Sequence, residues 1–334
     1  MITLSEVRSA RRRIHPFVRR TPLVRSHHLS DELGTNLYLK LELFQRTGAF
    51  KLRGAFNRML SLNGRERERG VVAVSGGNHA QAVACAAREL GLAALILMPR
   101  LTPSNYVWGT RSYGAEISFS STMAEAFSSI PAYEAEGWTY IHPFDDPLVI
   151  AGQGTIGLEL LEDLPEVTDV VISIGGGGLA GGVATVLRTL KPSVRIWGVE
   201  TEGAESMACA LTAGRVVELK AVTSIARTLG APSVSDITLA LAQKYLEGVT
   251  VVTDKEAVEA LFVLLDHAKV LAEPAASCTL AAATRLQSQF SPESHVALIL
   301  CGGNVAIDDL CACRDSFMPL VRPEVGRSLA VSLP

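Results

Sequence analysis

Residues 170–182 read VVISIGGGGLAGG, an apolar run that predicts a buried strand, followed by four successive glycines. The segment after the glycines is apolar and of helical length, so the glycines occupy a strand-to-helix turn. Backbone N–H groups in such a turn can bind a phosphate group, and the helix dipole favours the negative charge. We therefore interpret Gly175, Gly176, Gly177 and Gly178 as a phosphate-binding segment, with a structural loop as the alternative.

Strand-length apolar runs alternate with helical patterns over most of the chain. The strand candidates are Val71–Val74, Leu95–Met98, Val170–Ile174, Ile196–Glu200, Thr250–Val252 and His295–Leu300. A helix is predicted over Asn78–Leu90. This alternation indicates an α/β fold with mainly parallel sheets covered by helices on both faces. Ligands of such folds bind beyond the carboxyl ends of the strands, where the glycine-rich segments fall.

The composition excludes several classes of protein. The 334 residues suffice for about two domains, and 48% hydrophobic with 19% charged residues describes a compact globule. A net charge of −3 gives no reason to expect nucleic acid as a partner. No apolar run reaches the roughly 20 residues that span a membrane. The basic start has no apolar region after it, which favours an exposed helix over a targeting signal.

The six cysteines are scattered, with no paired CxxC spacing. This pattern favours reduced thiols in a cytoplasmic protein. Cys311 and Cys313 leave a metal site open as a weak alternative.

Two further segments carry candidate chemistry. Residues 46–55 read RTGAFKLRGA and place Lys51 just before a helix. Burial would lower the pKa of this lysine and free a nucleophilic amine, although an ordinary surface lysine is the alternative. Residues 75–81 read SGGNHAQ, a polar turn that opens the helix after the first strand candidate. Its N–H groups suit a carboxylate or phosphate, and a simple helix cap is the alternative.

The glycine-rich segment also permits a different enzyme class. Gly176, Gly178 and Gly181 fit the pattern GxGxxG, and Glu200 ends the next strand candidate. These features would support a dinucleotide site and an NAD-dependent oxidoreductase. The motif is weak by itself, and Glu200 could equally cap a helix or bind a cation.

In this order, the three segments resemble the fold-type II pyridoxal-phosphate (PLP) enzymes, specifically the group of threonine dehydratases, serine dehydratases and serine racemases. Further matching motifs, from residue 20 to about 304, are RTPL at 20–23, YLKLE at 38–42, AGQGT at 151–155, EP at 273–274 and CGGN at 301–304. The group has the pattern S-F-K-x-R-G-A around its cofactor lysine, and Ala49 replaces the serine here.

This resemblance implies two open α/β domains of the tryptophan synthase β type, with PLP in the cleft between them. The large domain would comprise residues 1–45 and 146–334, and the small, substrate-facing domain residues 46–145. Enzymes of this group usually form homodimers.

The resemblance also implies roles for individual residues. Lys51 would carry PLP as a Schiff base and remove the Cα proton of the substrate. The other cofactor-binding residues would be Phe50 beside the ring, Asn78 at the ring hydroxyl, Cys301 at the pyridine nitrogen, and Gly175, Gly176, Gly177, Gly178 and Leu179 at the phosphate. The substrate carboxylate would bind Ser75, Gly76, Gly77, Asn78 and His79. For His79 we favour a structural role over acid–base chemistry.

The reaction implied is β-elimination from a β-hydroxy amino acid of the threonine or serine type, which gives a 2-oxo acid and ammonia. No Lys or Arg lies between Arg111 and Arg188. A charged side chain would lack a partner there, so we expect a neutral one. Phenylserine and 3-hydroxyaspartate remain alternative substrates. Serine racemase activity is a further alternative, but racemase-like members have a serine where this chain has Gly76.

A cation site of the family aligns with Glu200, Ala204 and Ser206. Serine at the last position lowers the ligand charge, which favours a monovalent ion or a weakly bound divalent ion. The sequence SIARTLG at 224–230 replaces a common T-I-A-D-G, and nothing in the sequence explains Arg227.

Overall fold

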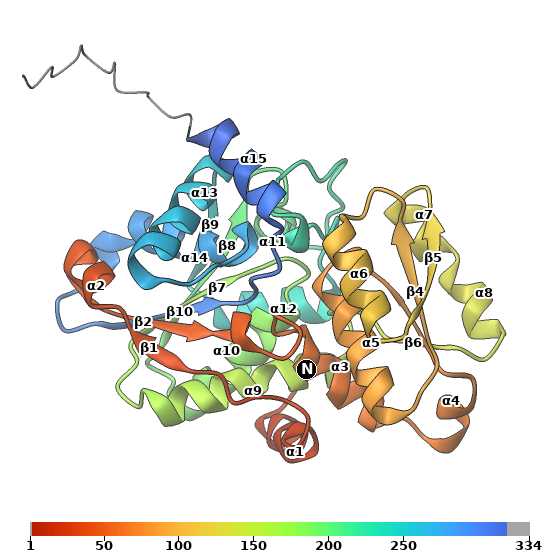
Figure 1. The fold of residues 1–334 in the computed structure, drawn as a ribbon. Coiled ribbons are helices and arrows are strands. Elements are labelled where there is room, and N and C mark those ends of the chain that lie inside the picture. Colours follow the sequence, from red (N-terminus) through yellow and green to blue (C-terminus); the bar gives the residue numbers. More distant parts are fainter. Residues whose placement is uncertain (1, 319–334) are drawn as a thin grey trace, which may run out of the picture.

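The computed structural model describes residues 2–318, which form two open sheets flanked by helices (Figure 1). One sheet has six strands in the order β1-β2-β10-β7-β8-β9, and the other has four in the order β5-β4-β3-β6. All strand pairs are parallel except β1 with β2, which is antiparallel. The predicted α/β class with mainly parallel sheets is confirmed.

The six-stranded sheet forms the larger part of the molecule. Its strands are β1 (Leu23–Arg25), β2 (Asn36–Leu41), β7 (Asp169–Ser173), β8 (Arg195–Thr201), β9 (Gly248–Val252) and β10 (His295–Leu300). The helices of this part are α1 (Leu4–Ile14), α2 (His27–Leu33), α9 (Pro147–Asp163), α10 (Gly178–Leu190), α11 (Ser206–Ala213), α12 (Asp236–Tyr245), α13 (Asp254–Val263), α14 (Pro274–Arg285) and α15 (Ile307–Phe317). Short helical turns are η1 (Glu42–Phe44), η2 (Arg227–Leu229), η3 (Leu264–Ala268) and η4 (Gln287–Gln289). Strand β7 is buried along its whole length, as expected for a parallel strand covered on both faces.

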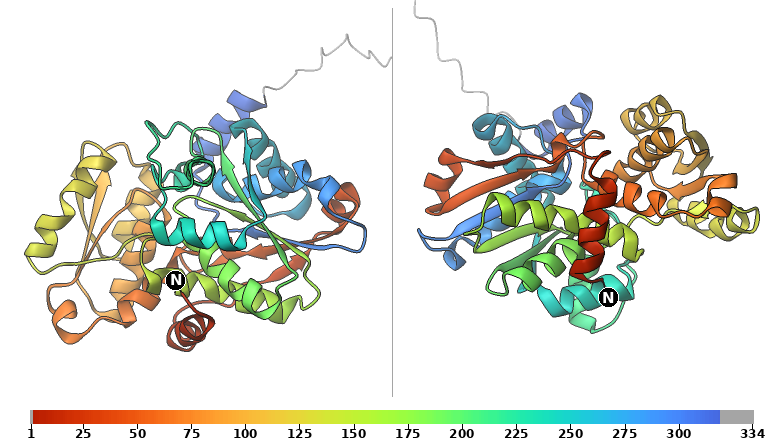
Figure 2. Two further views of the ribbon diagram at one scale, coloured as in Figure 1. Left: turned by 180° about the vertical axis from the view of Figure 1, so that it is seen from behind. Right: turned by 90° about the horizontal axis from the view of Figure 1, so that it is seen from below.

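The four-stranded sheet is built from one continuous stretch of chain, between residues 71 and 140. Its strands are β3 (Val71–Val74), β4 (Ala94–Pro99), β5 (Glu116–Ser120) and β6 (Thr139–Tyr140). The helices around it are α3 (Lys51–Leu60), α4 (Gly64–Arg69), α5 (Asn78–Leu90), α6 (Ser104–Ser112), α7 (Met123–Ser128) and α8 (Ile130–Ala135). Figure 2 shows this part standing beside the six-stranded part in both additional views. The domain boundaries at 45/46 and 145/146 remain predictions.

Helix α9 packs closely against the two helices that begin at the chemical motifs. Its start is fixed by Asp146, whose carboxylate accepts from the N–H groups of Leu148 and Val149. A Cβ atom at Gly152 would lie 2.6 Å from the carbonyl oxygen of Arg53 in α3, and one at Gly182 in α10 would lie 2.7 Å from the nitrogen of Gly154. Glycine therefore permits the close approach that holds α3 and α10 in place.

Two of the three motifs, and Cys301, lie at the carboxyl ends of strands. Residues 75–77 follow β3, residues 174–177 follow β7, and Cys301 follows β10, so each lies at the carboxyl end of a strand. The N–H group of Phe50 donates to the carbonyl of Cys301 at 3.0 Å, and Ala49 forms a β-bridge with Gly302. These backbone contacts join the start of α3 to the end of β10.

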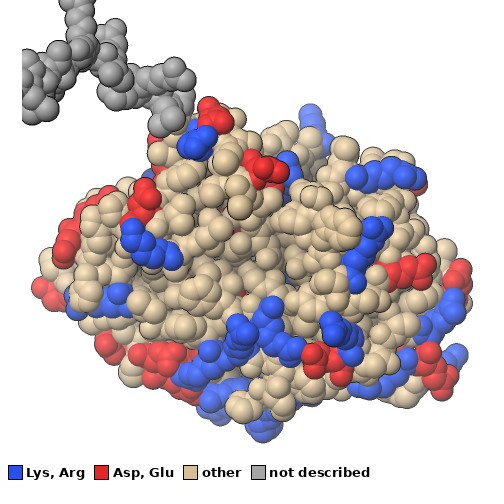
Figure 3. Space-filling model, in the orientation of Figure 1, with Lys and Arg blue, Asp and Glu red and all other residues tan. Residues whose placement is uncertain are grey.

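Surface charge and cysteine chemistry are unremarkable. In Figure 3 blue and red side chains alternate around the rim of the visible face, while its middle is largely uncharged. No helix within residues 2–318 has both the length and the apolar character needed to cross a membrane. All six cysteines are free thiols.

Candidate active site

Lys51 is a half-buried lysine at the first position of α3. Its Nζ donates to the carbonyl oxygen of Pro143 at 2.7 Å and lies 5.2 Å from the centre of the Phe50 ring. Within the described residues it forms no ion pair with a carboxylate. Burial lowers its pKa to about 8, so far more of the amine is neutral near physiological pH than for an exposed lysine. A half-buried, partly neutral amine can act as a nucleophile.

Cys301 provides a thiol close to this amine. Its Sγ accepts from Ser173 Oγ at 3.3 Å and contacts the carbonyl oxygen of Ala275 at 3.5 Å. Burial raises the pKa of Cys301 to about 12, so it remains a neutral thiol. Cys301 lies beside the start of α3, because its carbonyl oxygen accepts from the N–H group of Phe50, the residue before Lys51, at 3.0 Å.

The glycine segment presents a row of free amide groups. Gly177 caps α10 with a φ of 90°, a left-handed conformation that favours glycine. Side chains elsewhere in the segment are excluded, because a Cβ at Gly176 would collide with the Phe144 ring. In the part of the chain that the structure describes, none of the N–H groups from Gly175 to Leu179 donates a hydrogen bond to protein. This arrangement fits a phosphate group.

The loop after β3 presents a second, smaller set of amides. Ser75 N–H donates to the carbonyl of Leu97, and Gly77 N–H donates to Ser75 Oγ at 3.1 Å. The N–H groups of Gly76, Asn78 and His79 have no acceptor among residues 2–318. Three amides at the start of a helix suit a carboxylate.

Both polar atoms of the Asn78 side-chain amide form hydrogen bonds. Nδ2 donates to Glu273 Oε1 at 2.7 Å, and Oδ1 accepts from Asn304 Nδ2 at 2.8 Å. Glu273 also accepts from Thr228 Oγ1 at 2.8 Å. Sequence reasoning placed Glu273 and Asn304 in matching motifs but gave neither a role, and it missed Thr228.

Two histidines near Lys51 are neutral. His79 Nε2 donates to the carbonyl of Ile141 at 2.8 Å, and burial lowers its pKa to about 3. This contact supports the structural role that we favoured. His142, which the sequence analysis did not single out, accepts through Nδ1 from the N–H groups of Phe144 and Asp145, and burial lowers its pKa to about 4.

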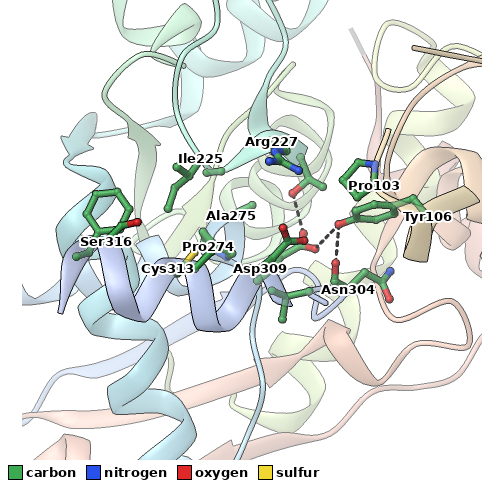
Figure 4. A pocket seen from close by; sticks show the side chains of 16 residues that line it. Pro103, Tyr106, Ile225, Arg227, Pro274, Ala275, Asn304, Asp309, Cys313 and Ser316 are labelled. Carbon is green, nitrogen blue, oxygen red and sulfur yellow. Dashed lines mark hydrogen bonds between the residues drawn. The ribbon is translucent and has the colours of Figure 1, made fainter. Parts of the chain in front are cut away.

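A cavity of about 170 Å³ adjoins the partners of Asn78 (Figure 4). Its walls include Glu273 and Thr228, the previously unexplained Arg227, and Tyr106 from α6. The Tyr106 hydroxyl donates to the carbonyl oxygen of Asn304 at 2.7 Å, as Figure 4 shows. Lys51 and Cys301 do not line this cavity. The cavity therefore lies next to the candidate active site and does not contain its reactive groups.

The region predicted to bind a cation is occupied by protein contacts. Both carboxylate oxygens of Glu200 accept backbone N–H bonds, from Met207 and Ala208, each at 2.8 Å. Burial raises the pKa of Glu200 to about 8. Ala204 is buried beside these residues, and Ser206 Oγ is buried without a partner. Residues 2–318 contain no group of three or more His, Cys, Asp or Glu side chains arranged for a metal, and this includes Cys311 and Cys313. The two N–H contacts of Glu200 are those of a helix cap, one of its two predicted alternatives, and the cation site stays a prediction.

Comparisons with known proteins agree with this site. Residues 14–302 match a family described as "Pyridoxal-phosphate dependent enzyme". The chain is 41% identical over 310 residues to an L-threonine ammonia-lyase of Thermotoga maritima, covering 92% of this chain and 77% of the relative.

Solved structures show the same similarity. Maize serine racemase matches with a TM-score of 0.88 and 36% identity, covering 94% of this chain and 97% of its own. A processed form of threonine deaminase isoform 2 from Solanum lycopersicum matches with a TM-score of 0.89 and 34% identity, covering 95% and 92%. These findings, together with the free amides and the half-buried amine, displace the NAD alternative. The chain belongs to the pyridoxal-phosphate dependent enzymes, in the fold-type II group of threonine/serine dehydratases and serine racemases, and is a lyase.

Proposed function

We propose that this protein eliminates water from a β-hydroxy amino acid of the threonine or serine type and releases a 2-oxo acid and ammonia. The observation that carries the proposal is Lys51, a half-buried amine that has no carboxylate partner within residues 2–318 and whose pKa is lowered to about 8. It lies in the same site as two sets of free backbone amides, after β3 and after β7. The similar L-threonine ammonia-lyase from Thermotoga maritima supports the choice of reaction.

The residues present fit PLP. We assign its phosphate to the N–H groups of Gly175–Leu179, its ring hydroxyl to Asn78 and its pyridine nitrogen to Cys301, with Phe50 beside the ring and covalent attachment at Lys51. When bound, PLP supplies an electron-withdrawing ring that makes the Cα proton of the substrate removable. Because Cys301 has a pKa of about 12, it would hold the ring nitrogen through a hydrogen bond without protonating it fully. That environment favours rapid loss of a leaving group.

Substrate binding and proton transfer then depend on groups of the protein itself. The free N–H groups of Gly76, Asn78 and His79 bind the substrate carboxylate. The Lys51 amine accepts the Cα proton. Arg53 cannot bind an acidic substrate side chain, because it is fully buried and paired with Glu42 and Glu159. This supports a neutral side chain, as in threonine or serine, with phenylserine and 3-hydroxyaspartate as alternatives.

The proposed function is tested by incubating the PLP-loaded protein with L-threonine, L-serine, phenylserine and 3-hydroxyaspartate. We expect ammonia and the matching 2-oxo acid in equal amounts, with the highest kcat/KM for a neutral substrate. Borohydride reduction followed by peptide mass spectrometry should place the pyridoxyl group on Lys51. Attachment at another lysine, or no 2-oxo acid from any of the four, would refute the proposal.

Racemisation needs a proton donor on the face of the substrate opposite Lys51, and Gly76 offers no side chain for this. A positioned acid or base is typically worth about 10²- to 10⁴-fold in rate. We therefore expect D-serine to form far more slowly than pyruvate from L-serine, as followed by chiral chromatography. Comparable rates would favour the serine racemase alternative.

A variant that introduces a serine at position 76, to supply the missing proton donor, needs two substitutions rather than one. A Cβ at Gly76 would lie 2.7 Å from Thr102 Oγ1, so a serine at this position requires Thr102 to move. The double substitution Gly76→Ser/Thr102→Ala creates the space, and we expect it to raise D-serine formation above that of Thr102→Ala alone.

We further propose that the enzyme is a cytoplasmic homodimer whose small domain, residues 46–145, faces the substrate. We also propose a monovalent or weakly bound divalent cation near Glu200, Ala204 and Ser206, because the buried Ser206 hydroxyl has no hydrogen-bond partner within residues 2–318. Light scattering tests the dimer. Thermal unfolding in K⁺, Na⁺, Mg²⁺ and Ca²⁺ tests the cation, and equal midpoints in all four would count against it.

A further inference from the structure

Glu273 is a buried carboxyl group whose partners come from distant parts of the chain. Its side chain is 3% exposed, and Oε1 accepts from both Asn78 Nδ2 at 2.7 Å and Thr228 Oγ1 at 2.8 Å. The Tyr106 hydroxyl lies 3.5 Å from Oε2. Burial raises the pKa of Glu273, and the hydrogen bonds from Thr228 and Asn78 oppose that shift. Burying a carboxyl group costs free energy unless hydrogen bonds compensate, and the donors around Glu273 provide them.

The contacts around Glu273 fix the orientation of the Asn78 amide. The carbonyl oxygen of Thr47 can only accept, so the amide group at 2.8 Å from it must be Asn304 Nδ2. The second N–H of that group donates to Asn78 Oδ1 at 2.8 Å. Asn78 therefore turns its Nδ2 toward Glu273, and one N–H of Nδ2 remains without an assigned acceptor.

We propose that Glu273 is a positioning residue that acts through Asn78. By accepting from one N–H of Asn78 Nδ2, it leaves the other as a donor to the ring hydroxyl of PLP. This inference rests on the proposed function, because it requires PLP to bind beside Asn78. In this proposal Glu273 affects the contact between Asn78 and the ring hydroxyl of PLP. It affects neither the binding of the substrate nor that of the phosphate.

The network also connects the two sheets of the molecule. Tyr106 lies in α6 beside the four-stranded sheet, whereas Glu273 and Asn304 belong to the six-stranded part. Tyr106 contacts Oε2 only at 3.5 Å, while the oxygen that faces Asn78 is Oε1. Tyr106→Phe removes the hydroxyl near Oε2 and its bond to the carbonyl of Asn304, but it keeps the contact between Glu273 Oε1 and Asn78 Nδ2, so it serves as a control for that contact.

The test compares PLP with an analogue in which hydrogen replaces the ring hydroxyl. Dissociation constants of both are measured on the apoenzyme, so the readout does not depend on turnover. We expect the wild type and Tyr106→Phe to bind PLP about five- to tenfold more tightly than the analogue, as for one net hydrogen bond. In Glu273→Gln this preference should fall to about twofold or less, with affinity for the analogue little changed. The absorption maximum of bound PLP should shift as well.

An unchanged preference in folded Glu273→Gln would overturn the inference. If that variant does not fold, Asn304→Ala provides the same test, because it releases the other end of the Asn78 amide and should also reduce the preference. In an Asn78→Ala background, Glu273→Gln should have no further effect on the preference, and a further loss would contradict action through Asn78. Failure of the wild type to bind PLP at Lys51 would instead refute the proposed function.

Discussion

Lys51 and Arg53 lie two residues apart in the first turn of α3, Lys51 half-buried and Arg53 fully buried, and their environments are opposite. Arg53 donates to Glu42 at 2.7 and 2.9 Å and to Glu159 at 2.7 and 3.0 Å. Lys51 donates only to a neutral carbonyl, that of Pro143. Burial lowers the pKa of Lys51 to about 8. Burial also acts to lower the pKa of Arg53, but Glu42 and Glu159 overcome it and the net pKa is raised.

The difference shows how one helical turn serves two purposes. A buried cation with carboxylate partners stays charged and acts as a structural element. A buried cation without them is pushed toward its neutral form and becomes reactive. Removing the Lys51 side chain should therefore lower the rate of the reaction, whereas removing the Arg53 side chain should lower the free energy of unfolding.

The largest expected effect is that of Lys51→Ala. In the proposed function Lys51 both carries the cofactor and accepts the Cα proton, so kcat for elimination should fall at least about 10³-fold, within the range for a positioned base. The unfolding midpoint should not decrease, since no ion pair is lost. Lys244→Ala, at an exposed lysine of α12, is the control. Substantial residual activity would show that another group supplies the base.

Arg53→Met should act on stability instead. It leaves Glu42 and Glu159 buried without their cation, and breaking a buried pair in this way typically costs about 3–5 kcal/mol. Denaturant unfolding of the apoenzyme measures this loss. Neutralising the carboxylates as well, in Arg53→Met/Glu42→Gln/Glu159→Gln, should restore part of it. A loss below about 1 kcal/mol would mean that the cluster is unimportant for folding.

The pKa of Lys51 predicts how cofactor loading depends on pH. Attachment requires the neutral amine, whose fraction rises about tenfold per pH unit below the pKa and levels off above it. The rate of covalent PLP incorporation into the apoenzyme should therefore increase up to about pH 8 and then become constant. Rapid mixing followed by borohydride trapping gives this rate. A rate that continues to rise toward pH 10 would show that burial does not lower this pKa.

Arg227 extends the comparison to an exposed cation, and it should have the smallest effect. It lines the cavity beside Glu273, and no ion pair is formed by its side chain within residues 2–318. Exposed charges contribute little, so Arg227→Gln should change kcat/KM for threonine by about threefold or less. If the wild type instead prefers 3-hydroxyaspartate and Arg227→Gln loses that preference, Arg227 binds an acidic side chain and our expectation of a neutral one is wrong.

The fold could be predicted well where strands are apolar and buried. The bounds of β3, α5 and β10 are those expected from the sequence, and β7, β8, β4 and β9 differ by one or two residues at an end. Strand β2 was missed because its lysine, Lys40, is fully buried in contact with Glu159, which a hydropathy pattern cannot indicate. Strand β5 was missed because its residues are only partly buried, and β6 because it has two residues.

The site could be predicted as far as its residues are contiguous in sequence. Lys51, the loop at 75–79 and the glycines at 175–178 each form a local pattern. Asn78 and Glu273, by contrast, are 195 residues apart in the chain, and only the folded structure brings them into hydrogen-bonding distance. The position of Arg227 was equally unpredictable, because η2 has no periodicity that would indicate a cavity wall.

The strand order of the larger sheet has a consequence for the synthesis of the protein. Strand β10 lies between β2 and β7, although it is the last strand within residues 2–318. A nascent chain that has emerged from the ribosome only to residue 290 has no strand to place there, so the centre of that sheet remains open. The four-stranded sheet needs only residues 71–140 and involves contacts of much shorter sequence separation, which form faster. During translation the part around residues 71–140 can therefore fold first, while the site proposed for the cofactor is completed only when Cys301 arrives at the end of β10.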